Sequence, residues 1–131
     1  SGGAGAFRGG LGIAREIMAV DDDVVFSARS DGHETGAPGI HGGQAGTPGH
    51  LWHLRPDGSR TVLSSKAAQL DLAAGESIRL ETPGGGGYGE PTARDPADLA
   101  RDLHSGKFSE ATARAAYGDA LVDRALALGK D

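Results

Sequence analysis

The sequence has no cysteine and no long apolar run, and each absence excludes a class of protein. Without cysteine, the chain cannot form disulfides, thiolate zinc sites or a cysteine nucleophile. Nowhere do about 18 apolar residues follow one another, so no segment is predicted to span a membrane. No signal peptide is visible, and we expect a cytoplasmic protein.

Basic residues are also scarce. Lys and Arg number 13 against 18 Asp and Glu, which gives a formal net charge of -5 at pH 7. A protein that coats a nucleic-acid duplex needs a basic stripe to neutralise the phosphates. The charge balance therefore argues against nucleic acid as a partner.

Glycine, in contrast, is abundant: it makes up 23 of the 131 residues, against a usual share of ~7%. Twenty of these glycines precede Pro91, and alanine and charged residues with helical spacing follow it. This shift predicts a glycine-rich β domain over residues 1–91 and a helical tail over residues 92–131. The chain starts at Ser1 without a methionine, and we expect it to be part of a longer protein.

The predicted fold class is mainly β, antiparallel with glycine-rich loops, followed by short C-terminal α-helices. Leu11, Ile13 and Ile17 recur at period two, which is typical of a strand. Ala14 and Met18 lie four residues apart, which leaves a helix open for the same segment. The strand is the favoured interpretation.

Three consecutive aspartates, residues 21–23, separate this segment from the β-branched and aromatic run 24–26. We predict a hairpin across them. A calcium loop is the other interpretation, but the spaced ligands and closing glutamate are missing, which favours a solvated turn. Further short strands are predicted at residues 61–63, 70–72 and 78–81.

Residues 30–56 show no sustained period and are predicted to form one long loop, a feature that is often functional. This loop holds four histidines and two acidic residues: His33, His41, His50, His53, Asp31 and Glu34. Imidazole and carboxylate groups could bind zinc or manganese, but the spacing matches no closed site and no His-Glu-x-x-His motif. Solvated histidines are the favoured interpretation, and we predict no metal ligand in this chain.

The tail carries clear helix signals. Asp95 can cap a first helix that starts with Pro96, because proline suits the first helical position. Ser109 can cap a second helix, and Asp119 a third that runs to Leu128. Helices this short are marginal alone, so they must pack on the β part or on another chain.

The two glycine clusters allow a phosphate-binding interpretation and a structural one. Residues 84–89 follow a predicted strand, but no Gly-Lys-Ser/Thr motif appears. Residues 3–8 lack the third glycine of a dinucleotide-binding fingerprint. The favoured interpretation is that these glycines permit positive φ angles and close backbone approach. Ordering four consecutive glycines costs much entropy, so neighbours, a ligand or a partner must hold them.

Support for a catalytic nucleophile is weak. Lys66 follows Ser64 and Ser65, and a Ser–Lys pair can be catalytic, but no Gly-x-Ser-x-Gly elbow surrounds them. We predict no catalytic residue in this chain. Arg8 stands between Phe7 and two glycines, where a guanidinium can clamp a substrate carboxylate or form a structural ion pair. The ion pair is the favoured alternative.

Several stretches together resemble the hydantoinase B family. The first are residues 1–5, 8–12 and 15–17, which read SGGAG, RGGLG and REI. Residues 39–43 and 46–49, GIHGG and GTPG, are similar to the family's glycine–proline loop. These matches occur in the family's order along the chain.

The most specific match is ETPGGGGYGEP over residues 81–91, which follows Ser65-Lys66 and Gly75-Glu76 as in the family. Arg94-Asp95-Pro96 and Tyr117-Gly118 fit the family's C-terminal helices. Glu76 and Glu90 stand where aspartate is usual, which keeps the charge. Residues 32–35 stand where relatives often carry basic residues, which puts a ligand contact there in doubt.

The resemblance implies that the chain is the C-terminal fragment of a larger hydantoinase B-type subunit. Such subunits pair with, or are fused to, a hydantoinase A-type subunit that uses ATP, so a hetero-oligomer is expected. The family opens cyclic amides such as hydantoins and 5-oxoproline at the expense of ATP. The resemblance places ATP and a divalent metal in the parent complex, with none in this chain and with the metal ligands upstream of Ser1.

The expected function is therefore a structural and active-site-flanking module of an ATP-dependent cyclic amide hydrolase. Two alternatives stay open: a module of an ATP-dependent ketone carboxylase, and a non-catalytic domain for subunit assembly. The isolated chain is expected to be inactive. The candidate residues for a substrate or interface loop are Arg8, Gly9, Gly10, His41, Gly84, Gly85, Gly86, Gly87 and Tyr88.

Overall fold

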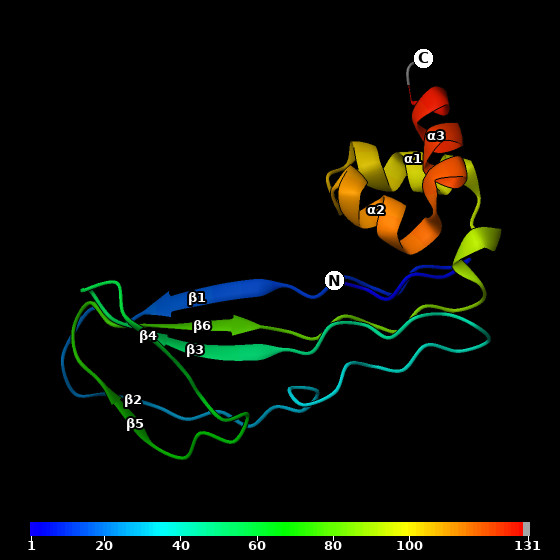
Figure 1. Cartoon of the computed structure of the whole chain (residues 1–131). Helices are drawn as coiled ribbons and strands as arrows, with labels where there is room; N and C mark the ends of the chain where they lie inside the picture. Colours follow the sequence, from blue (N-terminus) through cyan, green and yellow to red (C-terminus); the bar gives the residue numbers. More distant parts are fainter. Residues whose placement is uncertain (130–131) are drawn as a thin grey trace.

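Two antiparallel sheets and a cap of three helices make up the computed structural model, which describes residues 1–129 (Figure 1). The larger sheet has the order β1 (Ala14–Met18), β6 (Ser77–Glu81), β3 (His50–Leu54) and β4 (Arg60–Val62). Its strands are antiparallel, with Ile17 of β1 opposite Ile78 of β6 and Leu51 of β3 opposite Leu80.

The smaller sheet pairs β2 (Val24–Phe26) with β5 (Leu70–Leu72) and lies beneath one end of the larger one (Figure 1). Leu51 and Ile78 of the larger sheet form a buried cluster with Leu72 of the smaller sheet and with Ala19. Apolar burial between the two sheets is therefore the main stabilising term at this end of the molecule.

The predicted hairpin across the three aspartates is wrong. β1 pairs with β6, and Val24–Phe26 pairs with β5, so the aspartates connect two different sheets. Tertiary hydrogen bonds fix this crossing: the backbone N–H of Ala19 donates to the carbonyl of Glu76 (2.8 Å), and Asp22 Oδ1 accepts from the N–H of Ala74 (2.9 Å). These long-range contacts determine the path of the chain.

The long loop predicted over residues 30–56 is wrong at its end, because β3 lies within it and pairs with both β6 and β4. Leu51 and His53 of β3 are buried while the residues on either side of them are more exposed. The alternation was present in the sequence, but a buried histidine in an apolar position concealed it.

The three helices lie where the tail sequence predicts them: α1 (Pro96–His104), α2 (Glu110–Tyr117) and α3 (Asp119–Leu128), after a short 3-10 turn (Pro91–Ala93). Asp95 and Ser109 cap α1 and α2 as expected, since their side chains accept from the backbone N–H groups of Ala97 and Thr112. The cap of α3 is instead Gly118 at φ 83°, and Asp119 is the first helical residue.

The three helices together, which we call the helical cap, have their own buried cluster, centred on Leu99, Ala113 and Val122. Ala4, from the start of the chain, belongs to this cluster, so the helices pack on the β part.

The predicted antiparallel strands and short C-terminal helices are confirmed, with about as many residues in helices as in strands. The domain division at 91/92 stays a prediction. Within residues 1–129, no helix is long and apolar enough to cross a membrane.

Candidate functional site

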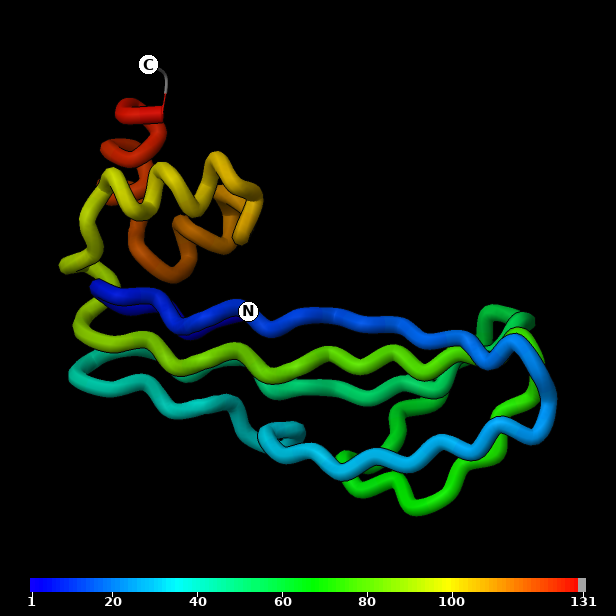
Figure 2. Tube along the Cα trace, turned by 180° about the vertical axis from the view of Figure 1, so that it is seen from behind, coloured from blue at the N-terminus to red at the C-terminus, as the bar shows by residue number. Residues whose placement is uncertain are grey.

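Three glycine-rich segments extend from the larger sheet toward the cap and run side by side (Figures 1 and 2). They are residues 1–12, 36–49 and 82–90, which together we name the glycine bundle. Hydrogen bonds join every pair of these segments. The bundle therefore brings together the candidate glycines that are far apart in the sequence.

The glycines of the bundle are required because backbone lies where a side chain would start. A Cβ at Gly84 would lie closer than 3.0 Å to the carbonyl oxygen of Ser1, and one at Gly87 equally close to that of Ala4. A Cβ at Gly9 would meet the carbonyl of Gly85 in the same way. Such distances are far inside van der Waals contact, so the segments could not approach this closely with any other residue.

The contacts between the segments repeat every three residues. Four backbone bonds of 2.7 to 3.0 Å show this: Gly84 N–H to Thr47 O, Gly87 N–H to Gln44 O, Thr47 N–H to Ser1 O and Gln44 N–H to Ala4 O. A three-residue repeat with bonds between segments is typical of polyproline II-like chains, whose crowded interior accepts only glycine. The segment 36–49 is thus an ordered part of the bundle.

Four of the five glycine N–H groups between Gly84 and Gly89 are occupied within the bundle. Those of Gly84, Gly85 and Gly87 donate to carbonyls of the other two segments, and that of Gly89 donates to Ile40. A phosphate-binding loop needs such N–H groups free to point at the anion. The geometry therefore favours the structural interpretation of these glycines.

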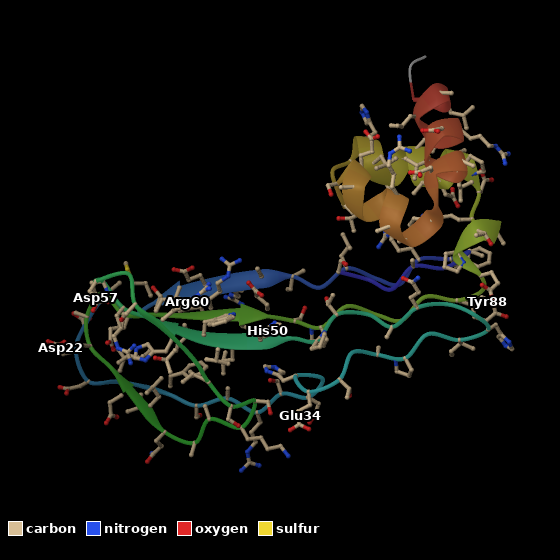
Figure 3. The ribbon with its side chains drawn as sticks, viewed as in Figure 1. Asp22, Glu34, His50, Asp57, Arg60 and Tyr88 are labelled. Atoms are coloured by element: carbon tan, nitrogen blue, oxygen red, sulfur yellow. The ribbon has the colours of Figure 1, made fainter. Side chains whose placement is uncertain are left out.

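One end of the bundle carries an exposed apolar cluster, which we name the aromatic tip: Phe7, Ile40, His41 and Tyr88. Phe7 and Tyr88 exchange two backbone hydrogen bonds of 3.0 and 2.9 Å, and Ile40 donates to Gly87 (2.9 Å). The ring of Tyr88 lies 5.1 Å from that of His41, edge to face, and 6.2 Å from that of Phe7. Figure 3 shows Tyr88 at the far end of the molecule from the small sheet.

The tip is exposed although its backbone is fixed. Phe7 is 68% exposed and Tyr88 51%. His41 adopts a positive φ of 51°, which is uncommon for a residue with a Cβ. Gly42, which follows His41, and Gly89, which follows Tyr88, also have positive φ angles. Rigid backbone that presents exposed aromatic side chains is typical of a surface that contacts something else.

The third candidate side chain, Arg8, points to the helical cap. Its Nε donates to Asp102 Oδ2 at 3.0 Å, and its Nη1 donates to the carbonyl of Gly9 at 2.6 Å. Arg94 and Lys107 also bind the Asp102 carboxylate, Lys107 at 2.8 Å. The structure thus brings together His41 and Tyr88, whereas Arg8 forms an ion pair that ties the bundle to α1.

Asp102 was missed at the sequence level. Burial raises the pKa of its carboxyl, but hydrogen bonds from Arg8 and Lys107 and the charges of Arg8 and Arg94 outweigh burial, and the pKa falls below its usual value. One signal was available: Asp102 lies on the apolar face of α1, three residues after Leu99. A charged residue at such a position indicates a buried ion pair.

The loop histidines do not converge. His33 hydrogen-bonds Ser30 (2.7 Å), and His50 stacks on Trp52 at 5.9 Å, which Arg60 also covers (Figure 3). Nε2 of the buried His53 lies 3.1 Å from Glu76, a carboxylate whose pKa is lowered by the backbone N–H of Ala73 and also by His53. Within residues 1–129, no three metal-binding side chains lie together.

The Ser64–Lys66 motif forms a local turn, in which Ser64 Oγ accepts from the backbone N–H of Lys66 at 3.2 Å. The three aspartates likewise form a connection. Asp23 has a positive φ of 65°, and Asp22 caps the turn at Ala74. The structure therefore assigns both motifs a role in the path of the backbone.

Similarity to known proteins extends over nearly the whole chain. The family model for hydantoinase B/oxoprolinase matches residues 1–91. The chain is 37% identical over 122 residues to an uncharacterized protein of Methanocaldococcus jannaschii, and 34% identical over 120 residues to the B subunit of a putative D-/L-hydantoinase of Pseudomonas sp.. These matches cover 93% and 91% of the chain but 21% and 20% of the relatives.

A solved structure has the same fold. Nucleotide-free acetone carboxylase, from a study of ATP-dependent acetone carboxylation, aligns with 90% of this chain and 20% of its own, with a TM-score of 0.69 and 21% identity. The chain thus spans about a fifth of the length of each of these three proteins. The bundle-forming sequence lies within the matched residues 1–91, and the chain belongs to the hydantoinase B/oxoprolinase family.

Proposed function

We propose that the chain is a structural and active-site-flanking module of an ATP-dependent cyclic amide hydrolase of the hydantoinase/5-oxoprolinase type. The observation that carries this proposal is the aromatic tip, where the rigid bundle presents Phe7, His41 and Tyr88 to solvent. Family membership and the hydantoinase name of a relative support the reaction class.

The tip suits a role at the edge of a substrate site. Its rings are held by a backbone that is hydrogen-bonded on several sides, so covering a substrate with them costs little further ordering entropy. Exposed aromatic side chains exclude water from what they cover and contact a flat ring over a large area. In this role the chain positions and shields the ring, while reacting groups come from elsewhere in the enzyme.

The reaction itself requires activation, because amide resonance makes the ring carbonyl a poor electrophile. In the proposed mechanism, ATP transfers its γ-phosphoryl group to the amide oxygen of the ring substrate, which is bound on a hydantoinase A-type partner subunit, and ADP leaves. Water then attacks the activated carbon and the ring C–N bond breaks with protonation of the nitrogen. A second water releases the phosphate and leaves the carboxylate. The Pseudomonas relative is named as one of the subunits of its enzyme, which supports a partner of this kind. The proposed complex is cytoplasmic.

A divalent metal is expected in the parent complex, and we propose that its ligands lie outside this chain. The four histidines between His33 and His53 each have a different neighbour: Ser30, Tyr88, Trp52 and Glu76. The donor set needed for a metal is therefore not assembled by residues 1–129. No step of the proposed mechanism uses a metal held by this chain.

The test is an assay of the full-length protein that contains this chain, purified with its partner. ADP formation is measured with hydantoin, with 5-oxoproline, and with acetone plus bicarbonate. We expect activity with a cyclic amide, and a fall of about tenfold or more in kcat/KM for Tyr88→Ala. Val25→Ala, which truncates a similarly exposed side chain on the small sheet, is the matched control and leaves kcat/KM unchanged.

Two results would contradict the proposal. If ADP forms with acetone and bicarbonate but not with hydantoin or 5-oxoproline, the chain belongs to the ketone carboxylase branch. Full activity of Tyr88→Ala with a cyclic amide removes the tip from the substrate site and leaves the chain a role in assembly.

A further inference from the structure

The edge of the larger sheet at β1 is open. β1 pairs with β6 only, and hydrogen bonds flank the pairing at Thr82 N–H to Ile13 O (2.9 Å) and Ala19 N–H to Glu76 O (2.8 Å). Bonds alternate along an antiparallel pair, so Ala14, Glu16 and Met18 direct their N–H and C=O groups away from β6. Among residues 1–129, no strand pairs with this side of β1.

The edge strand carries two charged residues, Arg15 and Glu16, but it also leaves large apolar side chains in water. Ile17 is 55% exposed although it lies directly opposite Ile78, which is only 4% exposed. Ile13, at 68%, continues the same face just before the strand begins. The face of the larger sheet that packs on the small sheet thus continues into β1, where the small sheet no longer covers it. The strand has no proline and no break, which are the features that, besides charge, protect natural edges left in water.

We propose that this edge binds a further β-strand. The strand comes from the rest of the full-length protein, which corresponds to the part of the relatives that this chain does not match. The Methanocaldococcus and Pseudomonas relatives are more than four times as long as this chain, so they contain the sequence that could supply it. The strand would carry apolar residues facing Ile13 and Ile17 and a polar or basic residue facing Glu16.

A second copy of the chain fits this edge less well. Antiparallel self-pairing in the fully overlapping register places Glu16 opposite Glu16, and a shift by one pair toward the N-terminus places Arg15 opposite Arg15. A shift by one pair toward the C-terminus places Glu16 opposite Met18 and Arg15 opposite Ala19, which leaves both charges without a counter-charge. Like charges directly opposite in a sheet are destabilising. The charges at the edge therefore favour a different strand as the occupant. This inference rests on the family, not on the proposed reaction, so either can fail without the other.

The test uses the 131-residue chain and overlapping synthetic peptides, each about 15 residues long, that cover the unmatched part of the Pseudomonas hydantoinase relative. We expect at least one peptide to bind and to slow hydrogen exchange of the Ala14, Glu16 and Met18 amides by about tenfold or more. Glu16→Pro removes one outward N–H without breaking a bond to β6, and should abolish binding. Glu16→Ala keeps that N–H and should retain binding.

Stability of the Glu16→Pro chain, measured by thermal unfolding, separates loss of binding from loss of folding. If it unfolds, Ile17→Asp replaces it, with Val25→Asp on the small sheet as the control of similar exposure. The proposal is overturned if no peptide slows exchange at these three amides. It is equally overturned if exchange there slows only as the concentration of the chain rises, which indicates a second copy.

Discussion

Arg8 and Asp102 are 94 positions apart in the sequence and form an ion pair with an Nε–Oδ2 distance of 3.0 Å. The pair joins the first segment of the glycine bundle to α1 of the cap. Arg94 and Lys107 share the same carboxylate, so one negative charge holds three positive ones. The carboxylate of Asp102 thus adds a charged contact between the helices and the bundle to the apolar packing of Ala4 against the helices.

Replacing Asp102 by asparagine should therefore destabilise the chain strongly. The variant leaves Arg94, only 7% exposed, without its counter-charge, and breaking a buried pair in this way costs about 3 kcal/mol or more. Asp98→Asn, which breaks an exposed pair with Arg101, should cost well under about 1 kcal/mol. Urea unfolding of the two variants checks the prediction, and equal losses would contradict it.

The contribution of Asp102 should also depend on pH. Folding lowers its pKa below the ordinary value of 3.8, so the unfolded chain takes up this proton at a higher pH than the folded chain. The stabilisation is complete above that value and is lost as the pH falls through the folded pKa. The free-energy difference between the wild type and Asp102→Asn should be constant near neutral pH and shrink below about pH 4. A difference that stays constant into strong acid would refute this.

Single alanine substitutions in the glycine run should reveal how closely the bundle is packed. Gly87→Ala places a methyl group against the Ala4 carbonyl and should cost about 1–3 kcal/mol or more. Gly10→Ala is the control within the same bundle, because a Cβ there meets no atom within 4 Å. Melting temperatures decide the matter, and an unchanged value for Gly87→Ala would mean that the segments are not held at this distance.

Gly89 tests a second property of the run, its backbone conformation. Its φ is 74°, so the sequence-based prediction of at least one positive φ between Gly84 and Gly89 is confirmed. Gly89→Ala should destabilise the chain by about 1 kcal/mol through backbone strain. Gly89→Asn should cost less than Gly89→Ala, because asparagine tolerates this region better. Equal melting temperatures for the two variants would argue against strain as the cause.

The purified chain should neither hydrolyse ATP nor open hydantoin or 5-oxoproline by itself. Four of the five glycine N–H groups between Gly84 and Gly89 are bonded within the bundle, and the sequence has no Gly-Lys-Ser/Thr motif. Phosphate release and ring opening are measured with the 131-residue chain and with the Gly87→Ala variant as a preparation control. Turnover that the wild-type chain retains after repeated purification would contradict the prediction.

Local signals were sufficient for the helices but not for the sheets. Asp95, Pro96 and Ser109 mark helix starts through contacts within one turn, and the structure has helices there. Val24–Phe26 instead pairs with β5, more than 40 residues later, and no local pattern specifies that partner. β3 was missed because a histidine, His53, occupies a buried position of the strand, while the apolar Trp52 and Leu54 occupy its more exposed positions.

The candidate site was predictable only in part. The resemblance indicated the glycine clusters, His41 and Tyr88, but not how they meet. The three segments of the bundle contact one another through backbone hydrogen bonds that repeat every three residues. Because the pattern of apolar side chains does not reveal such contacts, the sequence predicted loops for these segments. Phe7 was noted only as a neighbour of Arg8, and its pairing with Tyr88 depends on a register between segments some 80 residues apart.

The three-segment bundle also constrains the order of events during synthesis. Residues 1–4 leave the ribosome before residues 44–47, which are their hydrogen-bond partners, and before Gly84 and Gly87, which are their close glycine contacts. A chain emerges from its N-terminal side, and contacts of high sequence separation form late. The first segment therefore stays without its neighbours until most of these residues have been translated, and the aromatic tip can form only after Tyr88 has cleared the exit tunnel.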